Sequence, residues 1–187
     1  MPSEKLAVES KFKMHEAREA IISRLSRDLP VTIDLDKFLR AVVSEIGQMI
    51  GVDRCDVIQF TDERQLKISH EWQSSTLIPS TEGLIIPIDA EKLSGHFDLT
   101  KPLRVNDTSE PETVPPRARL LAATFKTRSL LIVPILLNSK VLGLLGLHDT
   151  KKPRVWLDDE VAFLESIAQQ LAIGYQYTRL YTDKQQE

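Results

Sequence analysis

The chain has 187 residues, of which 42% are apolar and 27% charged, and its formal net charge is -3. This length fits one domain with helical extensions better than two independent folds. Its basic residues are scattered and mostly lie near Asp or Glu, so no nucleic-acid partner is expected, because phosphate binding needs clustered Lys and Arg.

The cysteine content, the first residues and the apolar runs exclude several further classes. Cys55 is the single cysteine, and one thiol with four histidines provides neither an internal disulfide nor a zinc pattern. Residues 1–10 lack the apolar core of a signal peptide. The longest apolar run, 130–137, is far too short to span a bilayer. We therefore expect a cytoplasmic protein with no metal site and no membrane partner.

Two helices are predicted at the start of the chain. Residues 3–28 carry apolar side chains at roughly helical spacing, and Pro30 ends this helix. A second helix can begin at Asp34 or Asp36 as its N-cap and close at Gly51. Its apolar face comprises Phe38, Leu39, Val42, Val43, Ile46, Met49 and Ile50.

The pattern then changes to that of strands. Residues 52–60 and 66–72 predict an antiparallel hairpin with one solvent-exposed face, since apolar and polar residues alternate in the second segment through Trp72. Residues 84–88 predict a short third strand, and Pro87 places it at a sheet edge or strand end.

The middle of the chain is mixed. We expect a short helix over 89–97, a brief strand over 103–105, and a helix beginning at Pro116. The near-continuous apolar runs 130–137 and 141–147 predict two central strands covered on both faces. Gly143 and Gly146 leave gaps in the second run, where another backbone or a ligand can approach closely.

A last long helix opens at residues 156–160, with acidic residues in its first turn. Apolar positions then follow at alternating spacings of three and four, which is a heptad-like seam. We expect one side of this helix to pack on the sheet and the seam to meet a second copy of the chain. The expected homodimer contacts are Leu164, Leu171 and Tyr175.

The order of these elements resembles the GAF fold over roughly residues 20–180. Three stretches carry the resemblance: 129–135 followed by 141–148, the segment 102–107, and the opening of the last helix from Trp156. The resemblance implies an α+β fold with a central antiparallel sheet of about five or six strands. The N- and C-terminal helices would pack on one face of that sheet, and loops and short helices would lie on the other.

Within that family, residues 142–148 and 153–156 resemble the bilin-binding GAF domains of phytochromes and cyanobacteriochromes. The resemblance implies that His148 lines a ligand pocket. Their chromophore-linking Cys-His pair would fall at Arg117 and Ala118 here, and a thioether cannot form without a thiol. We therefore expect no covalent bilin, and the sequence leaves the identity of any cofactor open.

Each candidate pocket residue has two interpretations. His148 is either a polar strand end bonded to nearby backbone or a contact to a polar ligand. Asp107 either caps the turn that follows it or reaches the pocket. Trp72, His96 and Phe125 are either core residues or cavity lining. Arg128 is either an exposed arginine or a partner for an anionic ligand.

Enzyme motifs are missing from the chain. There is no Gly-rich phosphate loop, no nucleophile elbow and no metalloprotease helix. Cys55 lacks the resolving thiol that a GAF-fold methionine sulfoxide reductase would use, so no catalytic residue is predicted.

The sequence thus predicts a regulatory module with three parts. Residues 1–30 form a signalling and dimerisation helix, 31–180 the GAF domain, and 181–187 a tail. The expected function is a sensor domain of a bacterial histidine kinase or response regulator, which binds a small molecule and relays it to an output domain. The alternative is a ligand-free platform for dimerisation.

Overall fold

The computed structural model describes residues 2–28, 34–62, 65–87, 98–110, 112, 114 and 116–185. The helix expected over 89–97, and with it His96, lies outside these residues.

A six-stranded antiparallel sheet forms the centre of the molecule, as predicted. Its strand order is β3-β2-β1-β6-β5-β4. The strands are β1 (Arg54–Asp62), β2 (Gln65–Gln73), β3 (Ile85–Pro87), β4 (Leu103–Val105), β5 (Ser129–Leu137) and β6 (Lys140–Asp149). β3, which ends at Pro87, is an edge strand, and the β5–β6 hairpin pairs Leu130 with His148. The sheet on which the family resemblance depends is therefore confirmed.

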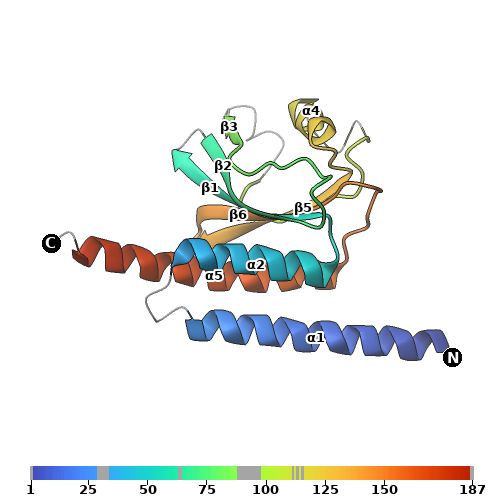
Figure 1. Ribbon diagram of the computed structural model, residues 1–187, viewed down its shortest axis with the longest axis horizontal. Coiled ribbons are helices and arrows are strands. Elements are labelled where there is room, and N and C mark those ends of the chain that lie inside the picture. The colour runs from blue at the N-terminus through green and yellow to red at the C-terminus, as the bar shows by residue number, and fades with distance from the viewer. Residues whose placement is uncertain are drawn as a thin grey trace.

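Long helices cover one face of the sheet, and a short helix lies over the other (Figure 1). α2 (Leu35–Ile50) packs on β1 and β2, and α5 (Asp158–Gln185) packs on β5 and β6. α4 (Pro116–Thr124) lies on the opposite side of the sheet. α1 (Pro2–Asp28) forms an outer layer against α5, where Arg18 donates to Ser166 at 3.0 Å.

Both ends of α2 follow the predicted capping chemistry. Asp34 is the N-cap, and its carboxylate accepts the backbone N–H of Lys37 at 3.4 Å. Gly51 closes the helix in the left-handed conformation, with φ of 70°, which glycine adopts without a steric cost.

The principal core lies between the sheet and the helices α2 and α5. Alternate residues of β1, β5 and β6 point into it, including Val57, Val133 and Leu145. Two of the three predicted dimer contacts are wrong, because Leu164 is 0% and Leu171 1% exposed inside this core. Tyr175 is half-buried, and its hydroxyl accepts from the Gln59 amide at 2.9 Å. The seam is the stripe by which α5 packs on its own sheet.

A β-bulge reverses the expected facing of β2. The pairing runs Val57 with His70 and then Ile58 with Ile68, so Ser69 is the extra residue. One extra residue transfers every following side chain to the other face of the sheet. Trp72 consequently packs against α2, where a Cβ on Gly47 would lie 2.1 Å from its ring.

Among the described residues no helix is long and apolar enough to cross a bilayer.

Candidate ligand-binding site

The face of the sheet opposite the long helices carries the candidate site. Strand alternation directs Arg54, Asp56 and Ile58 of β1 to this face. From β6 it directs Leu144, Gly146 and His148, and from β5 Leu130 and Ile132. The segment from α4 to Thr127 lies over these strands and borders a half-open cavity of ≈160 Å³.

Apolar side chains make up most of the cavity wall. They come from the sheet, from the segment before β3, and from α4 with the residues after it. The apolar lining is Ile58, Ile68, Leu84, Ile86, Ala118, Leu121, Ala122, Phe125, Leu130 and Ile132. Polar groups gather at one part of the wall, around Arg54, Asp56 and His148. An apolar cavity with a few convergent polar groups is the usual form of a small-molecule site.

Asp56 and His148 meet at the floor of the cavity. The Asp56 side chain is 0% exposed, and Nε2 of His148 lies 2.8 Å from its Oδ2. This contact is short but lacks the direction of a hydrogen bond. Both carboxylate oxygens and both imidazole nitrogens have no hydrogen-bond partner among the described residues. The pair therefore retains unused hydrogen-bonding capacity at the cavity.

Gly146 makes room for this pair. It lies opposite Asp56 in the β1–β6 register, and a Cβ there would stand 2.4 Å from Oδ1 of Asp56 and 2.9 Å from Nε2 of His148. The close approach predicted at Gly146 is thus made by a carboxylate of the chain itself. At Gly143 the approaching atom is the carbonyl oxygen of Ile58.

Arg54 is held by the loops that surround the cavity. Its guanidinium, 1% exposed, donates to the Pro79 carbonyl at 2.9 Å and to the Thr127 hydroxyl at 2.6 Å. Its Nε also lies 3.9 Å from a carboxylate oxygen of the buried Glu71. Burial lowers the pKa of Arg54, and the nearby Asp56 and Glu71 oppose this shift.

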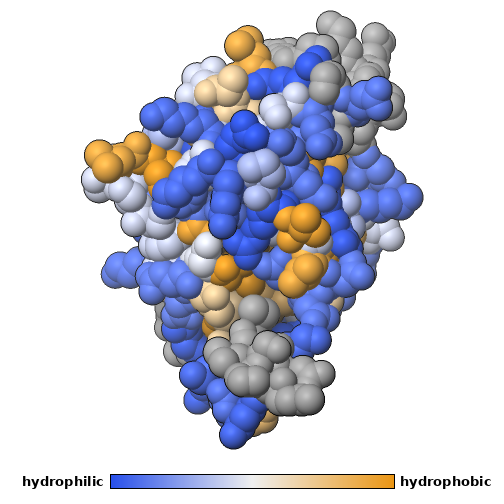
Figure 2. Space-filling view, turned by 90° about the vertical axis from the view of Figure 1, so that its right-hand side faces the viewer, coloured by the Kyte–Doolittle hydropathy of each residue, from blue (hydrophilic) through white to orange (hydrophobic). Residues whose placement is uncertain are grey.

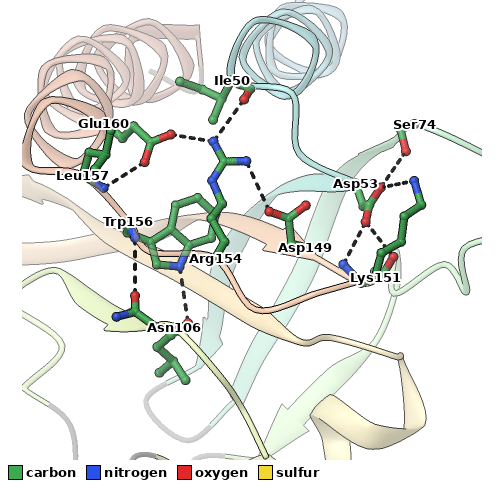
Figure 3. Close-up of polar contacts among 12 residues, drawn as sticks. Ile50, Asp53, Ser74, Asn106, Asp149, Lys151, Arg154, Trp156, Leu157 and Glu160 are labelled. Atoms are coloured by element: carbon green, nitrogen blue, oxygen red, sulfur yellow. Dashed lines mark hydrogen bonds and ion pairs between the residues drawn. The ribbon is translucent and has the colours of Figure 1, made fainter.

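A polar cluster ties the end of β6 to the beginning of α5 (Figure 3). Arg154 donates to Asp149 at 3.2 Å, to Glu160 at 2.5 Å and to the Ile50 carbonyl at 3.2 Å, and it stacks over the Trp156 ring. Burial lowers the pKa of Arg154, but Glu160 and Asp149 raise it more, so the guanidinium stays charged. This cluster positions the first turn of α5 relative to the strand that carries His148.

The structure separates the residues predicted for the pocket. His148 and Phe125 line the cavity, whereas Trp72 faces α2 on the other side of the sheet. Arg128 lines a neighbouring hollow and pairs with Asp107 at 3.0 Å. Asp107 also accepts from the backbone N–H and hydroxyl of Ser109, which is the turn-capping role. His96 lies outside the described residues.

Sequence reasoning missed the two charged residues of the cavity. Arg54 and Asp56 alternate with Cys55 and Val57 in an otherwise apolar strand. Alternating charges in a strand that pairs on both sides signal a polar feature on a covered face, and this pattern could have identified them.

Cys55 points into the helix-side core and is completely buried. Burial raises the pKa of the Cys55 thiol well above its ordinary value, and the adjacent Asp56 adds to the shift. A protonated, enclosed thiol is a poor nucleophile, and the geometry gives no support to cysteine chemistry.

The cavity does not fit a covalently attached bilin. The single cysteine faces the other side of the sheet, so no thiol can reach the cavity. A core cavity of about 150 Å³ holds a benzene-sized molecule. A tetrapyrrole, with four linked rings, needs several times that volume.

Similar sequences occur in sensor histidine kinases. The chain is 28% identical over 182 residues to the circadian input-output histidine kinase CikA of Thermosynechococcus vestitus, covering 92% of this chain and 25% of that protein. It is 22% identical over 166 residues to the methanogenesis regulatory histidine kinase FilI of Methanothrix harundinacea, covering 84% of this chain and 18% of that protein. The chain therefore spans about a quarter or less of these relatives.

Solved structures share the fold. The phycocyanobilin-bound GAF domain of a cyanobacterial phytochrome superposes with a TM-score of 0.76 at 20% identity, covering 88% of this chain and 96% of that one. The chromophore-binding domain of the bacteriophytochrome RpBphP3 from R. palustris gives 0.74 at 18% identity, covering 91% and 63%. The GAF domain family model matches residues 34–175. With the six-stranded sheet and its flanking helices, this match shows that the chain belongs to the GAF domain family.

Proposed function

We propose that this chain is the regulatory sensor domain of a bacterial signal-transduction protein, a cytoplasmic histidine kinase or two-component response regulator. It binds a small molecule non-covalently in the cavity and relays that event to an output domain through its terminal helices. The chain itself acts by binding and not by catalysis. The similarity to two regulatory histidine kinases supports this class of protein.

One observation carries the proposal: the cavity and the output helix share a continuous set of contacts. His148 lines the cavity, and its neighbour Asp149 is bonded to Arg154. Arg154 is in turn bonded to Glu160 in the first turn of α5. Glu160 also accepts the backbone N–H of Leu157 at 2.9 Å, which closes that turn.

This arrangement suits a population shift. A ligand that changes the position of His148 changes the free energy of the Asp149–Arg154 contact and so the preferred placement of α5. Small shifts at a binding site become discrete because packed interfaces have few alternative arrangements.

The first test asks whether the cavity holds a small molecule. The protein is purified, denatured, and its extract analysed by mass spectrometry and visible absorbance. We expect a stoichiometric small molecule in the wild type and a loss of it in Ala122→Trp, which fills the cavity from α4. The matched control is Ala123→Trp, one residue along the same helix and exposed, which should retain the molecule.

The second test concerns the relay. Hydrogen exchange of the first turn of α5 should change when the extracted molecule is added back to stripped protein. If the molecule binds but hydrogen exchange over residues 158–165 is unchanged, the chain binds a ligand without relaying the event to α5, and the relay is refuted.

The alternative function is a ligand-free dimerisation platform. The small volume of the cavity and the exposed Val8 and Phe12 on α1 favour it. An empty extract from wild-type protein, together with unchanged melting temperatures across a metabolite panel, would support this alternative.

A further inference from the structure

The floor of the cavity carries a carboxylate that receives no hydrogen bond from the described residues. Asp56 is fully buried, yet neither of its oxygens has a hydrogen-bond partner among the described residues. A buried ionised carboxylate is costly unless it is paired with an opposite charge and hydrogen-bonded. The other carboxylates near the cavity show what such pairing looks like in this protein.

Glu71 and Asp53 are both satisfied. Glu71 accepts from the Ser80 hydroxyl at 2.7 Å, the Thr81 backbone N–H at 2.8 Å and the Thr81 hydroxyl, and it faces Arg54. Asp53 accepts from the backbone and hydroxyl of Thr150 at 2.9 and 2.8 Å and pairs with Lys151 at 2.9 Å. These bonds lower the pKa of Asp53 although burial alone raises it.

Two carboxylates share one guanidinium at this part of the cavity wall. Asp56 and Glu71 both act on Arg54, and the imidazole of His148 lies 2.8 Å from Asp56 at an angle that makes no hydrogen bond. The described residues hold no group of three or more metal-ligating side chains, so they offer no cage for a metal ion there.

The remaining wall of the cavity is mainly apolar. The cavity of ≈160 Å³ is close to the roughly 150 Å³ that holds benzene in a protein core. Phe125 contributes an aromatic ring to the lining, and such rings attract cations over their faces.

From these observations we propose that the cavity binds an arylalkyl amine with a single ring, the ring lying among the apolar side chains and the ammonium group on Asp56. This inference rests on the proposed sensor function and specifies its ligand class. The ammonium supplies the hydrogen-bond donors that Asp56 lacks, together with a positive charge. Asp56 lines the cavity wall beside His148, over the space that the missing side chain at position 146 leaves.

The experiment uses four probes that differ in charge: benzylamine, benzyl alcohol, toluene and benzoate. Affinity is measured by calorimetry, and the site is located from chemical-shift changes at the Gly146 amide. Wild-type protein should bind benzylamine at least about tenfold more tightly than toluene, which has no donor, because a hydrogen bond to a charged group contributes at least a decade of affinity. Benzyl alcohol, a neutral donor, should bind with an affinity between these two. Benzoate should bind most weakly of the four.

Two variants distinguish a ligand contact from a structural role. Asp56→Asn should abolish the preference for benzylamine and raise the melting temperature of the ligand-free protein, because it removes a buried charge that receives no hydrogen bond. Asp53→Asn is the matched control. It removes a buried carboxylate that is fully bonded, so it should lower the melting temperature and leave the preference for benzylamine intact.

Three results would overturn the inference. Equal affinity for toluene or benzyl alcohol would show a neutral ligand class and leave the proposed sensor function standing. A lower melting temperature of Asp56→Asn would show that Asp56 is a structural partner of His148. No binding of any probe would remove the proposed ligand class, and the extraction experiment with Ala122→Trp would then decide the sensor function separately.

Discussion

Gly146 illustrates how one missing side chain shapes the candidate site. The residue lies on the central strand β6, where glycine weakens strand packing. Its place is explained by the two polar side chains that occupy the space above it, Asp56 and His148. The missing side chain at Gly146 therefore makes room for Asp56 and His148, and the space is not left for a ligand alone.

Gly146→Ala should destabilise the protein by about 1–3 kcal/mol, because the new methyl group collides with the Asp56 carboxylate. The measurement is urea unfolding followed by circular dichroism. The double variant Gly146→Ala with Asp56→Ala should recover part of the loss, since the colliding carboxylate is gone. Strictly additive effects of the two changes would show that the collision is not the cause.

At the scale of elements, the connection from β6 to α5 is held by side chains more than by its own backbone. Residues 150–157 contain neither helix nor strand. Two residues of the connection, Arg154 and Trp156, hold it in place (Figure 3). The backbone N–H of Trp156 donates to the Asn106 side chain at 3.3 Å, and its indole N–H donates to the Val105 carbonyl at 3.3 Å. The beginning of α5 is therefore determined by contacts with β4, β6 and α2.

Arg154→Ala should cost about 3–5 kcal/mol, because it leaves two largely buried carboxylates, Asp149 and Glu160, without their cation. Chemical denaturation measures the free energy of unfolding. Lys152→Ala is the control, since Lys152 is exposed on the same connection and should change little. Equal losses in the two variants would contradict the role assigned to the cluster.

At the scale of the whole molecule, the question is which surface a second copy could use. The end of the molecule in Figure 2 is mainly hydrophilic, and its apolar side chains form small separate groups. On the terminal helices, exposed apolar side chains include Val8 and Phe12 of α1, at 66% and 61% exposure, and Ile173 of α5. Val8 and Phe12 are one helical turn apart and share a face. We therefore place the proposed homodimer contact on α1.

Light scattering tests this placement. Wild-type protein should be a dimer and Phe12→Glu a monomer with an unchanged circular dichroism spectrum, while the neighbouring exposed change Lys11→Glu should leave the dimer intact. Leu171→Glu should abolish cooperative unfolding, because it buries an unpaired charge in the protomer core. A monomeric wild type would refute the homodimer.

The element order, the strand pairing and the helix caps could be predicted from the sequence because they depend on local chemistry. Apolar periodicity, Pro87, Asp34 and Gly51 each act within a few residues. The bulge at Ser69 could not be predicted in this way. The apolar alternation continues through Trp72 as it would in a strand without a bulge, and only the strand pairing shows the extra residue.

The sequence by itself thus determined a GAF-type sheet with terminal helices and the absence of a thiol at the position where bilins attach, and it left two interpretations of His148 open. Only the tertiary structure decided that the heptad-like stripe of α5 packs on its own sheet, since an apolar stripe does not specify its partner. It also brought Asp56, Gly146 and His148 together from two strands about 90 residues apart in the chain. The cross-strand register decides which side chains of β1 and β6 face each other. It is a property of the folded sheet and cannot be read from either strand alone.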